Sequence, residues 1–469
     1  MRIAIVGTGV SGLVCAHVLS RRHQVTVFEA DDRPGGHAHT VRVDLADGTH
    51  EVDTGFLVYN DRNYPGLVTL FGQLGVATKA SDMSFGMTDD ISGVEWRGSS
   101  VNTVFAQRRN ALRPAFFRML ADVVRFNRTA RALLDGPGDP TLSLEGLLES
   151  GRWSRQFVDW YLIPMGSSIW SADPSTFLSM PAVTFARFFD NHGLLTYGDQ
   201  PSWRTVVGGS RRYVEAVLAP LGDRVRLSCP VSKLKRTAEG VEVRSEGGLE
   251  HFDHVVLATH SDQALELLSD PSPPERDVLG AIRYQPNRAT LHTDTSLLPR
   301  NRRAWASWNY HRLADQPDAA TLTYRLRSLQ GIESGDELLV TLNRDDAIRD
   351  DLVVARFDYA HPVLDVPAIA AQRRHEELNG AQRTWFCGAY WGYGFNEDGV
   401  QSARTVCRQL AGEDLLRPPR RSAGPMPPTW SAHGRRPGRR SRCGAASTRV
   451  WSPTTATSRW TIASPTASP

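Results

Sequence analysis

The sequence is poor in lysine, in paired cysteines and in long apolar runs. Only three of its 469 residues are lysine, at 79, 233 and 235. Its five cysteines are scattered, odd in number and never spaced as C-x-x-C. This argues against a disulfide framework and against any metal site, and it fits a reducing, cytoplasmic compartment. No run of about 18 uncharged apolar residues occurs, so no membrane-spanning helix is expected.

Acidic residues are missing from the last part of the chain. Residues 417–469 contain ten arginines and no acid, leaving 44 basic and 51 acidic residues elsewhere, a net charge of about −7. We therefore expect no general nucleic-acid binding by the rest of the chain. The Pro-, Arg- and Ser-rich segment has no helical or strand periodicity, which predicts a disordered tail. Two alternatives stay open, a basic arm for anionic partners and an out-of-frame translation.

The length and the 41% apolar content predict two domains with a large shared core. The first residues, MRIAIVGTGVSG, lack a charged segment ahead of the apolar run, which breaks at Gly7 and Gly9. We therefore expect a buried strand and a turn at this point rather than a signal peptide.

The first 30 residues follow the order strand, glycine turn, helix, strand, acid. Gly7, Gly9 and Gly12 fit G-x-G-x-x-G, followed by a predicted helix over residues 10–20 that carries Ser11 near its start. The first glycine permits the turn, the second lets a pyrophosphate approach, and the third lets the helix pack on the strand. The helix N-terminus then points at the phosphates. The pattern predicts a dinucleotide site.

An acid and a second pair of glycines indicate which dinucleotide the site binds. Glu29 ends the second strand, where a carboxylate accepts from ribose hydroxyls, which favours FAD or NAD over NADP. Gly35, Gly36 and His37 follow in EADDRPGGHAHT, which resembles the E-x-x-x-R-x-G-G stretch of the amine oxidase, phytoene desaturase and protoporphyrinogen oxidase flavoproteins. The resemblance implies FAD, with the glycine pair at its pyrophosphate. His37 stands where many relatives have arginine; it and His39 are polar neighbours of the flavin or covalent anchors.

Residues 61–200 read as a mostly helical insertion. Residues 115–134 are amphipathic, with arginine dominating the polar side, which indicates either a packed surface helix or a helix that docks onto anionic lipid. Residues 161–195 are apolar and aromatic, and either line a greasy pocket or form plain core.

The chain then returns to the cofactor domain and leaves it again. Residues 203–268 give strands and helices, and the resemblance implies that the backbone of Val231 lies at the adenine end. Residues 275–350 alternate in strand fashion, predicting an antiparallel floor for a substrate domain. His292, Trp305, Trp308 and Tyr310 are candidates to face substrate there, although a lone strand histidine is more often structural.

The stretch TWFCGAYWGYGFNEDGVQSA, from Thr384, is again strand, glycine turn and helix. We expect Gly388 and Gly399 to permit close approach, and N–H groups near Gly399 and Val400 to face the flavin ring. Tyr390, Trp391, Tyr393 and Phe395 would line the substrate side of the flavin ring or its edge.

Several longer stretches, among them YLIPMGSSIWS, WRTVVGGSRRYV and FCGAYWGYGFNEDGVQSA, resemble a bacterial family of FAD-dependent, amine-oxidase-like proteins whose genes often neighbour those of cyclopropane fatty acid synthases. The resemblance spans about residues 1–412. It implies an α/β fold with a Rossmann-like FAD-binding domain of the glutathione reductase type (residues 1–60, 201–270 and 355–415), interleaved with an α+β substrate domain (residues 61–200 and 271–354).

Three functions fit these residues. The first is hydride transfer to FAD from an apolar, lipid-type substrate, with a lipid-modifying enzyme as partner and peripheral contact with the inner face of the membrane. The second is amine oxidation, disfavoured because many amine oxidases use a strand lysine near the flavin and no lysine here has that context. The third is a non-catalytic flavoprotein partner of a lipid-modifying enzyme. The sequence names no catalytic residue.

Overall fold

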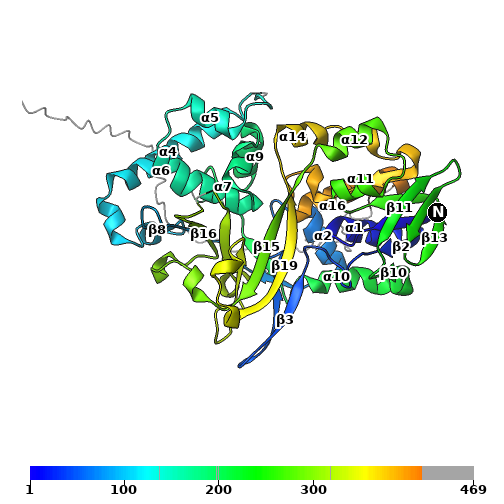
Figure 1. Ribbon diagram of the computed structural model, residues 1–469, viewed down its shortest axis with the longest axis horizontal. Coiled ribbons are helices and arrows are strands. Elements are labelled where there is room, and N and C mark those ends of the chain that lie inside the picture. Colours follow the sequence, from blue (N-terminus) through cyan, green and yellow to red (C-terminus); the bar gives the residue numbers. More distant parts are fainter. Residues whose placement is uncertain (137, 197, 199, 317, 413, 415–469) are drawn as a thin grey trace, which may run out of the picture. The chain divides into compact units, whose positions relative to one another are not determined.

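The structure is a computed structural model that describes residues 1–136, 138–196, 198, 200–316, 318–412 and 414. The tail predicted at residues 417–469 lies outside the described residues. Two sheets organise the described chain, a five-stranded parallel sheet and a seven-stranded mixed sheet (Figure 1). This is the mixed α/β fold expected from the sequence.

The parallel sheet collects strands that are far apart in the sequence. Its order is β10 (Val225–Arg226), β2 (Gln24–Phe28), β1 (Arg2–Val6), β14 (His254–Leu257) and β20 (Thr384–Phe386). Alternate residues of β1 face opposite sides: Ile3 and Ile5 join one apolar cluster, and Ala4 and Val6 join another. Burial on both faces explains the continuous apolar run RIAIV.

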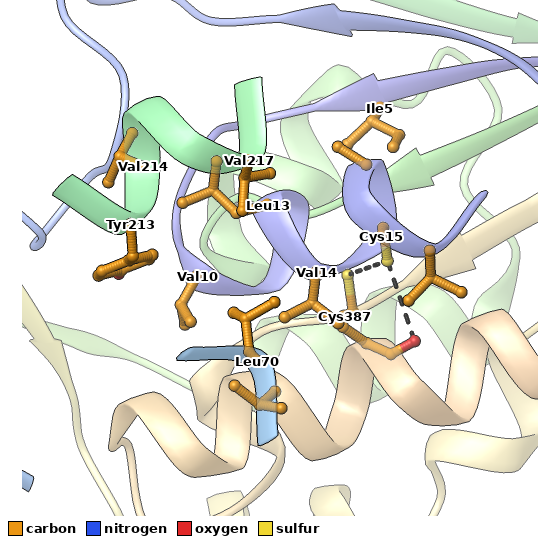
Figure 2. Close-up of a cluster of buried hydrophobic side chains, with 14 of the residues drawn as sticks. Ile5, Val10, Leu13, Val14, Cys15, Leu70, Tyr213, Val214, Val217 and Cys387 are labelled. Carbon is orange, nitrogen blue, oxygen red and sulfur yellow. Dashed lines mark hydrogen bonds between the residues drawn. The ribbon is translucent and has the colours of Figure 1, made fainter. Parts of the chain in front are cut away.

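Four helices contribute to the apolar cluster on one face of this sheet: α1 (Val10–Leu19), α2 (Pro65–Leu74), α10 (Arg211–Leu218) and α16 (Asn396–Ala411). Figure 2 shows α1 as their centre, with side chains of α2 and α10 around it. The Sγ atom of Cys15 lies 3.9 Å from that of Cys387, and all four described cysteines are free thiols. Helix α1 therefore serves both the core and the turn that precedes it.

The other face carries a small antiparallel sheet and four helices. The sheet consists of β11 (Val231–Arg236), β12 (Val241–Ser245) and β13 (Gly248–Phe252). The helices are α11 (Ser261–Leu267), α12 (Pro273–Gly280), α14 (Val366–Gln372) and α15 (His375–Leu378). The parallel sheet is thus covered on both faces, as in doubly wound folds.

The seven-stranded sheet has the order β19 (Val353–Pro362), β15 (Tyr284–His292), β18 (Leu339–Leu342), β17 (Thr321–Arg325), β16 (Trp308–Arg312), β7 (Phe85–Asp89) and β8 (Val94–Arg97). The expected antiparallel floor is present in β15 to β18, but β16 pairs with β7 in parallel. The sequence prediction missed this because β7 and β8 come from the insertion expected to be mostly helical. The predicted domain boundary at residues 354–355 falls inside β19.

The helical part of the insertion comprises α3 (Val101–Val104), α4 (Pro114–Ala132), α5 (Leu144–Ser150), α6 (Arg155–Phe157), α7 (Ile163–Trp170), α8 (Pro174–Leu178) and α9 (Ala182–Asn191). Residues 161–195 pack largely against one another and against α4. The rings of Phe185 and Phe189 are 3.9 Å apart, and those of Phe177 and Phe185 5.6 Å. This favours plain core over the lining of a pocket.

Short elements complete the described chain. They are the hairpin β3 (Thr40–Leu45) and β4 (Gly48–Asp53), the sheet β5 (Tyr59–Asn60), β9 (Trp203–Val206) and β6 (Thr78–Ala80), helix α13 (Leu326–Gln330), the π-helical turn η2 (Val158–Leu162), and the 3-10 turns η1 (Arg108–Leu112), η3 (Ala219–Arg224), η4 (Thr295–Leu297), η5 (Arg302–Ala304), η6 (Asp345–Ala347), η7 (Asp350–Leu352), η8 (Ala381–Arg383) and η9 (Ala389–Trp391).

One buried carboxylate joins segments from three parts of the sequence. Asp53, at the end of β4, accepts from Thr40 Oγ1 at 2.6 Å, Ser210 N at 2.9 Å and Gln330 Nε2 at 2.9 Å. Ser210 Oγ donates to it as well, at 2.7 Å. Asp53 thereby ties the β3–β4 hairpin to the residue before α10 and to the end of α13.

Candidate functional site

The turn between β1 and α1 is built by two glycines and leaves a third facing open space. Gly7 has a φ of 98°, and a Cβ there would lie 2.8 Å from the carbonyl oxygen of Ala258. A Cβ on Gly12 would lie 2.0 Å from the carbonyl oxygen of Gly7. A Cβ on Gly9 would meet no protein atom within 4 Å. The first and third glycines therefore shape the turn, and the second is where a ligand has room to approach.

Thr8 connects this turn to the acid and to the second glycine pair. Its backbone N–H donates to Glu29 Oε2 at 2.9 Å, and its hydroxyl donates to the same oxygen. Gly35 N in turn donates to Thr8 Oγ1 at 3.0 Å. Glu29 also accepts from Asp31 N at 3.1 Å. A carboxylate has about four lone-pair positions, so Glu29 retains capacity for a ribose hydroxyl.

The glycine pair at 35 and 36 lies against the turn. Both residues have positive φ, 113° and 57°, which favours glycine. A Cβ on Gly36 would come within 3.3 Å of Gly9 Cα. Arg33 Nη1 donates to the Gly36 carbonyl at 2.9 Å, which holds the loop in place. Two glycine segments about 27 residues apart thus present bare backbone at one location.

The segment that leads to Val231 is hydrogen-bonded to the backbone around Glu29. Cys229 N donates to the carbonyl of Glu29 at 2.8 Å, and Ser228 N donates to that of Asp31 at 2.8 Å. Val231 opens β11 two residues later and is buried. Its placement near the adenine end stays a prediction, but the structure does bring its segment to the acid.

The late glycine-rich stretch returns to the first turn. Ser11 Oγ donates to the Gly399 carbonyl at 3.0 Å, across 388 residues. Ser402 Oγ lies 3.0 Å from the carbonyls of both Gly388 and Gly399. The N-termini of α1 and α16 therefore meet at one place, where both helix dipoles favour negative charge. The late glycine-rich stretch therefore lies beside the first glycine turn, as the sequence suggested.

Three details of this stretch differ from expectation. A Cβ on Gly399 would lie 2.6 Å from Val10 Cγ1, and one on Gly388 would lie 2.2 Å from the Tyr390 ring, so both glycines are required by protein packing. Gly399 N donates to the Phe395 carbonyl at 3.2 Å. Val400 is fully buried in the core. The amides without an intrahelical acceptor therefore belong to the first turn of α16, Asn396–Asp398. These residues directly precede Gly399 and Val400, where the free N–H groups were predicted.

Both acids at the start of α16 are held by backbone amides. Glu397 accepts from Gly66 N and Leu67 N, each at 2.9 Å, at the start of α2. Asp398 accepts from Phe395 N at 2.9 Å. Burial raises the pKa of Asp398 to about 6 and also raises that of Glu397. These carboxylates organise helix ends. A cleft of about 610 Å³ opens beside them, lined by Arg62, Asn63, Pro65, Asp190, Asn191, Glu397 and Gln401.

A group of neutral imidazole and phenol side chains lies beside the glycine pair. His37 stacks on Tyr359 with centroids 4.9 Å apart, and His361 is 5.2 Å from His37. Tyr359 OH lies 3.0 Å from His39 Nδ1 and 2.7 Å from Thr54 Oγ1. Burial lowers the pKa of His39 and of His361 to about 4 and that of His37 well below its usual range. All three imidazoles are therefore uncharged at neutral pH.

The candidate pocket aromatics do not form one wall. Tyr390 is buried, and burial raises its pKa. Trp391 stacks on His375 with centroids 3.9 Å apart. Tyr393 packs against Phe188 of α9 at 5.4 Å. Trp308 is on the seven-stranded sheet, edge-on to Tyr324 at 5.0 Å, and no ring contact among the described residues joins it to the other three. Their role as pocket residues stays a prediction.

The other candidates on the substrate sheet are structural. His292 is fully buried, its Nε2 lies 2.7 Å from Thr341 Oγ1, and its Nδ1 accepts from Asp294 N at 3.0 Å. Trp305 Nε1 donates to the Pro299 carbonyl at 2.7 Å, and Tyr310 is buried in the sheet's core. The satisfied partners of His292 favour the structural interpretation over a role at substrate.

Neither a metal centre nor a membrane-spanning helix is found among the described residues. They contain no group of three or more His, Cys, Asp or Glu side chains arranged to hold a metal ion. No helix among them combines the length and the apolar character that crossing a bilayer requires.

Comparison with known proteins decides the family. Residues 10–301 match the profile of flavin containing amine oxidoreductases. The chain belongs to this family. A Mycobacterium tuberculosis protein named as a flavin-containing monoamine oxidase, AofH, is 27% identical over 293 residues, 58% of this chain and 60% of that protein. The chain thus spans about 60% of the length of the curated relatives it matches first.

Solved structures share the fold of this member of the family. Cyclohexylamine oxidase of Brevibacterium oxydans superposes with a TM-score of 0.63 at 16% identity, covering 87% of this chain and 99% of that one. A fatty acid isomerase of P. acnes gives a TM-score of 0.63 at 13% identity, covering 87% and 98%. Identities this low establish the architecture only.

The residues of the site fit FAD, the cofactor of this family. Gly9 leaves open space where a pyrophosphate would lie, and two helix N-termini converge there. His37 Nε2 is enclosed and lacks a hydrogen-bond partner among the described residues, and buried polar atoms normally have one. A hydroxyl or phosphate oxygen of the dinucleotide would satisfy it. The sequence analysis missed Thr8, although its position between two glycines of the motif could have indicated it. It also missed Tyr359 and His361, which no sequence signal marks.

Replacing His37 by alanine is expected to weaken FAD binding about tenfold, because one buried hydrogen bond of about 1 kcal/mol and one ring stack are lost. Flavin fluorescence during titration of the apoprotein measures the dissociation constant. Ala replacement of His50, a histidine on the β4 hairpin, is the matched control and should bind FAD as the unmodified protein does. Equal affinities for all three would remove His37 from the cofactor site.

Proposed function

We propose that this flavoprotein is an oxidoreductase that removes hydride from an apolar, lipid-type substrate, oxidising or desaturating it. Bound FAD supplies the two-electron acceptor. The chain's own residues position the substrate and keep water and charge away from it. The observation that carries the proposal is the neutral character of the buried imidazoles beside the glycine pair, His37, His39 and His361.

Four charged groups at the glycine pair and at the two helix ends are held by the backbone, whereas Arg62 and Asp190 line the neighbouring cleft. Glu29, Glu397 and Asp398 accept from backbone amides, and Arg33 donates to a backbone carbonyl. The buried side chains beside the glycine pair and Tyr390 are neutral imidazoles and phenols. An ammonium or a substrate carboxylate would therefore enter there without a charged partner, at a cost of several kcal/mol. An acyl chain carries no such cost.

The three lysines lie away from the site. Lys79 is exposed, with its Nζ 3.5 Å from the Gly331 carbonyl. Lys233 and Lys235 are exposed on β11 of the small antiparallel sheet. All three lysines thus lie on strands, contrary to the expectation from the sequence, but each is exposed, which supports a site without the lysine that many amine oxidases use near the flavin. The resemblance to proteins whose genes neighbour cyclopropane fatty acid synthases also supports a lipid setting.

Amine oxidation is the second candidate. The family and AofH favour it, and the shared fold hosts both cyclohexylamine oxidase and a fatty acid isomerase. Fold alone thus leaves both substrate classes open, and the neutral imidazoles beside the glycine pair support the apolar one.

Anaerobic flavin bleaching separates these candidates. The purified holoprotein is mixed with detergent-dispersed dioleoylphosphatidylglycerol or the uncharged ester methyl oleate, and separately with putrescine, cyclohexylamine or L-phenylalanine. The visible flavin absorbance is expected to fall with at least one lipid and to persist with the amines. Bleaching by an amine with none by lipid would replace the proposal by amine oxidation.

A further inference from the structure

Helix α4 has an unusual outward face. Its inward side is ordinary core, formed by Phe116, Met119, Val123 and Phe126. On the outward side, Phe117, Ala121 and Val124 are exposed at spacings of four and three residues, which places them in one stripe. Phe117 is 49% exposed and Val124 38%. An exposed phenylalanine and valine two turns apart on one helix are not explained by the packing of this chain.

The apolar stripe continues into the segments before α4. Leu112, the last residue of η1, is 86% exposed, and Val101, which starts α3, is 77% exposed. Phe105 joins α3 to α4, because its ring lies 5.9 Å from that of Phe117. The four exposed apolar residues 101, 112, 117 and 124 thus belong to neighbouring elements, because η1 contacts α4 and Phe105 connects α3 to α4.

Arginine surrounds these residues. Residues 101–132 contain seven arginines, at 108, 109, 113, 118, 125, 128 and 131, and one acid, Asp122. That acid is buried and paired with Arg125 at 3.1 Å. In the described part of the chain, Arg113, Arg118 and Arg128 make no ion pair. The segment is strongly basic although residues 1–416 carry a net charge of about −7.

We propose that this surface, formed by Val101, Leu112, Phe117 and Val124 with Arg113, Arg118 and Arg128, docks the protein onto an anionic phospholipid bilayer. Exposed apolar side chains enter the acyl boundary, and the arginines above them pair with headgroup phosphates; this combination characterises helices that lie in the interface. A nucleic acid would match the arginines but would leave the apolar residues in water. The surface stands on its own geometry and does not depend on the reaction proposed above.

Vesicle co-sedimentation of the holoprotein tests the proposal. We expect binding to vesicles of phosphatidylglycerol mixed with phosphatidylcholine, at least tenfold weaker binding to phosphatidylcholine alone, and loss of binding at high salt because the attraction is screened. The apolar variant V101S/L112S/F117S and the charge variant R113Q/R118Q/R128Q should each bind the mixed vesicles at least tenfold more weakly.

A matched control uses another exposed leucine and arginine. Leu249 is 47% exposed and faces Arg244 across the β12–β13 pair. The variant R244Q/L249S should bind vesicles as the unmodified protein does. FAD content and circular dichroism establish that each variant is folded. The proposal fails if the unmodified protein does not sediment with the mixed vesicles, or if the control loses binding to the same degree as the two surface variants. Because no turnover is measured, a failed lipid reaction leaves this test intact.

Discussion

Alanine at position 9 is expected to yield a folded protein that purifies without its yellow colour. A Cβ on Gly9 meets no protein atom within 4 Å, so the fold has no reason to change. The same Cβ would occupy the space where the pyrophosphate approaches the backbone. We expect the affinity for FAD to fall roughly 100-fold, about 2.7 kcal/mol, with the melting temperature of the apoprotein unaltered. Flavin fluorescence titration and thermal melting measure the two quantities.

Two other glycines supply the comparison. A Cβ on Gly12 would lie 2.0 Å from the Gly7 carbonyl oxygen, so Gly12→Ala should lower both stability and FAD affinity. Gly72 lies within α2, where a Cβ meets nothing within 4 Å, so Gly72→Ala should bind FAD normally and gain up to about 1 kcal/mol of stability. A yellow, stable Gly9→Ala protein would contradict the placement of the cofactor.

Removing the carboxylate of Asp53 is expected to cost about 3 to 5 kcal/mol of unfolding free energy. Buried donors of Thr40, Ser210 and Gln330 would lose their acceptor, at about 1 kcal/mol or more each. Urea denaturation of Asp53→Ala measures the change. Asp44→Ala, on the same hairpin but exposed, should stay within about 0.5 kcal/mol. Asp53→Asn keeps one acceptor oxygen and serves if the alanine variant does not fold.

The same residue predicts a pH dependence with a definite sign. Burial raises the pKa of Asp53 to about 6 in the folded protein, against the donors from Thr40 and Ser210 that lower it. Since the folded state then holds the proton more tightly than the unfolded chain, the contribution of Asp53 to stability falls as pH rises from about 4 to about 6. Relative to Asp53→Asn, the unmodified protein should lose stability in that window and none above it. An unchanged difference between pH 4 and 7 would contradict the shifted pKa.

The sequence predicted well those features that depend on residues close together in the chain. Gly7, Gly9 and Gly12 act within one turn, and the burial of β1 on both faces is legible in five consecutive residues. Docking of residues 115–134 onto anionic lipid was one of two interpretations that the sequence left open, because Arg118, Arg125 and Arg128 dominate the polar side of the helix, and it stays a proposal.

What the sequence did not reveal depends on contacts between distant segments. His37 meets Tyr359 and His361 across more than 300 residues, and nothing in the composition of β19 marks those two side chains. Gly388 and Gly399 looked like ligand-contacting glycines, but the Tyr390 ring and Val10 occupy the space a Cβ would need. The parallel pairing of β7 with β16 was hidden because a strand pair has no sequence signal when its members are separated by a helical insertion.

The contact between α1 and α16 also has a consequence for biosynthesis. The first glycine turn is translated long before its partners, because Ser11 finds its acceptor in Gly399, 388 residues later, and β20 completes the sheet only with Thr384–Phe386. Most of the polypeptide must therefore be translated before the two ends can close on each other, and contacts this remote in sequence form slowly. Until Gly399 and β20 have been translated, the glycine turn and the apolar face of α1 lack these contacts.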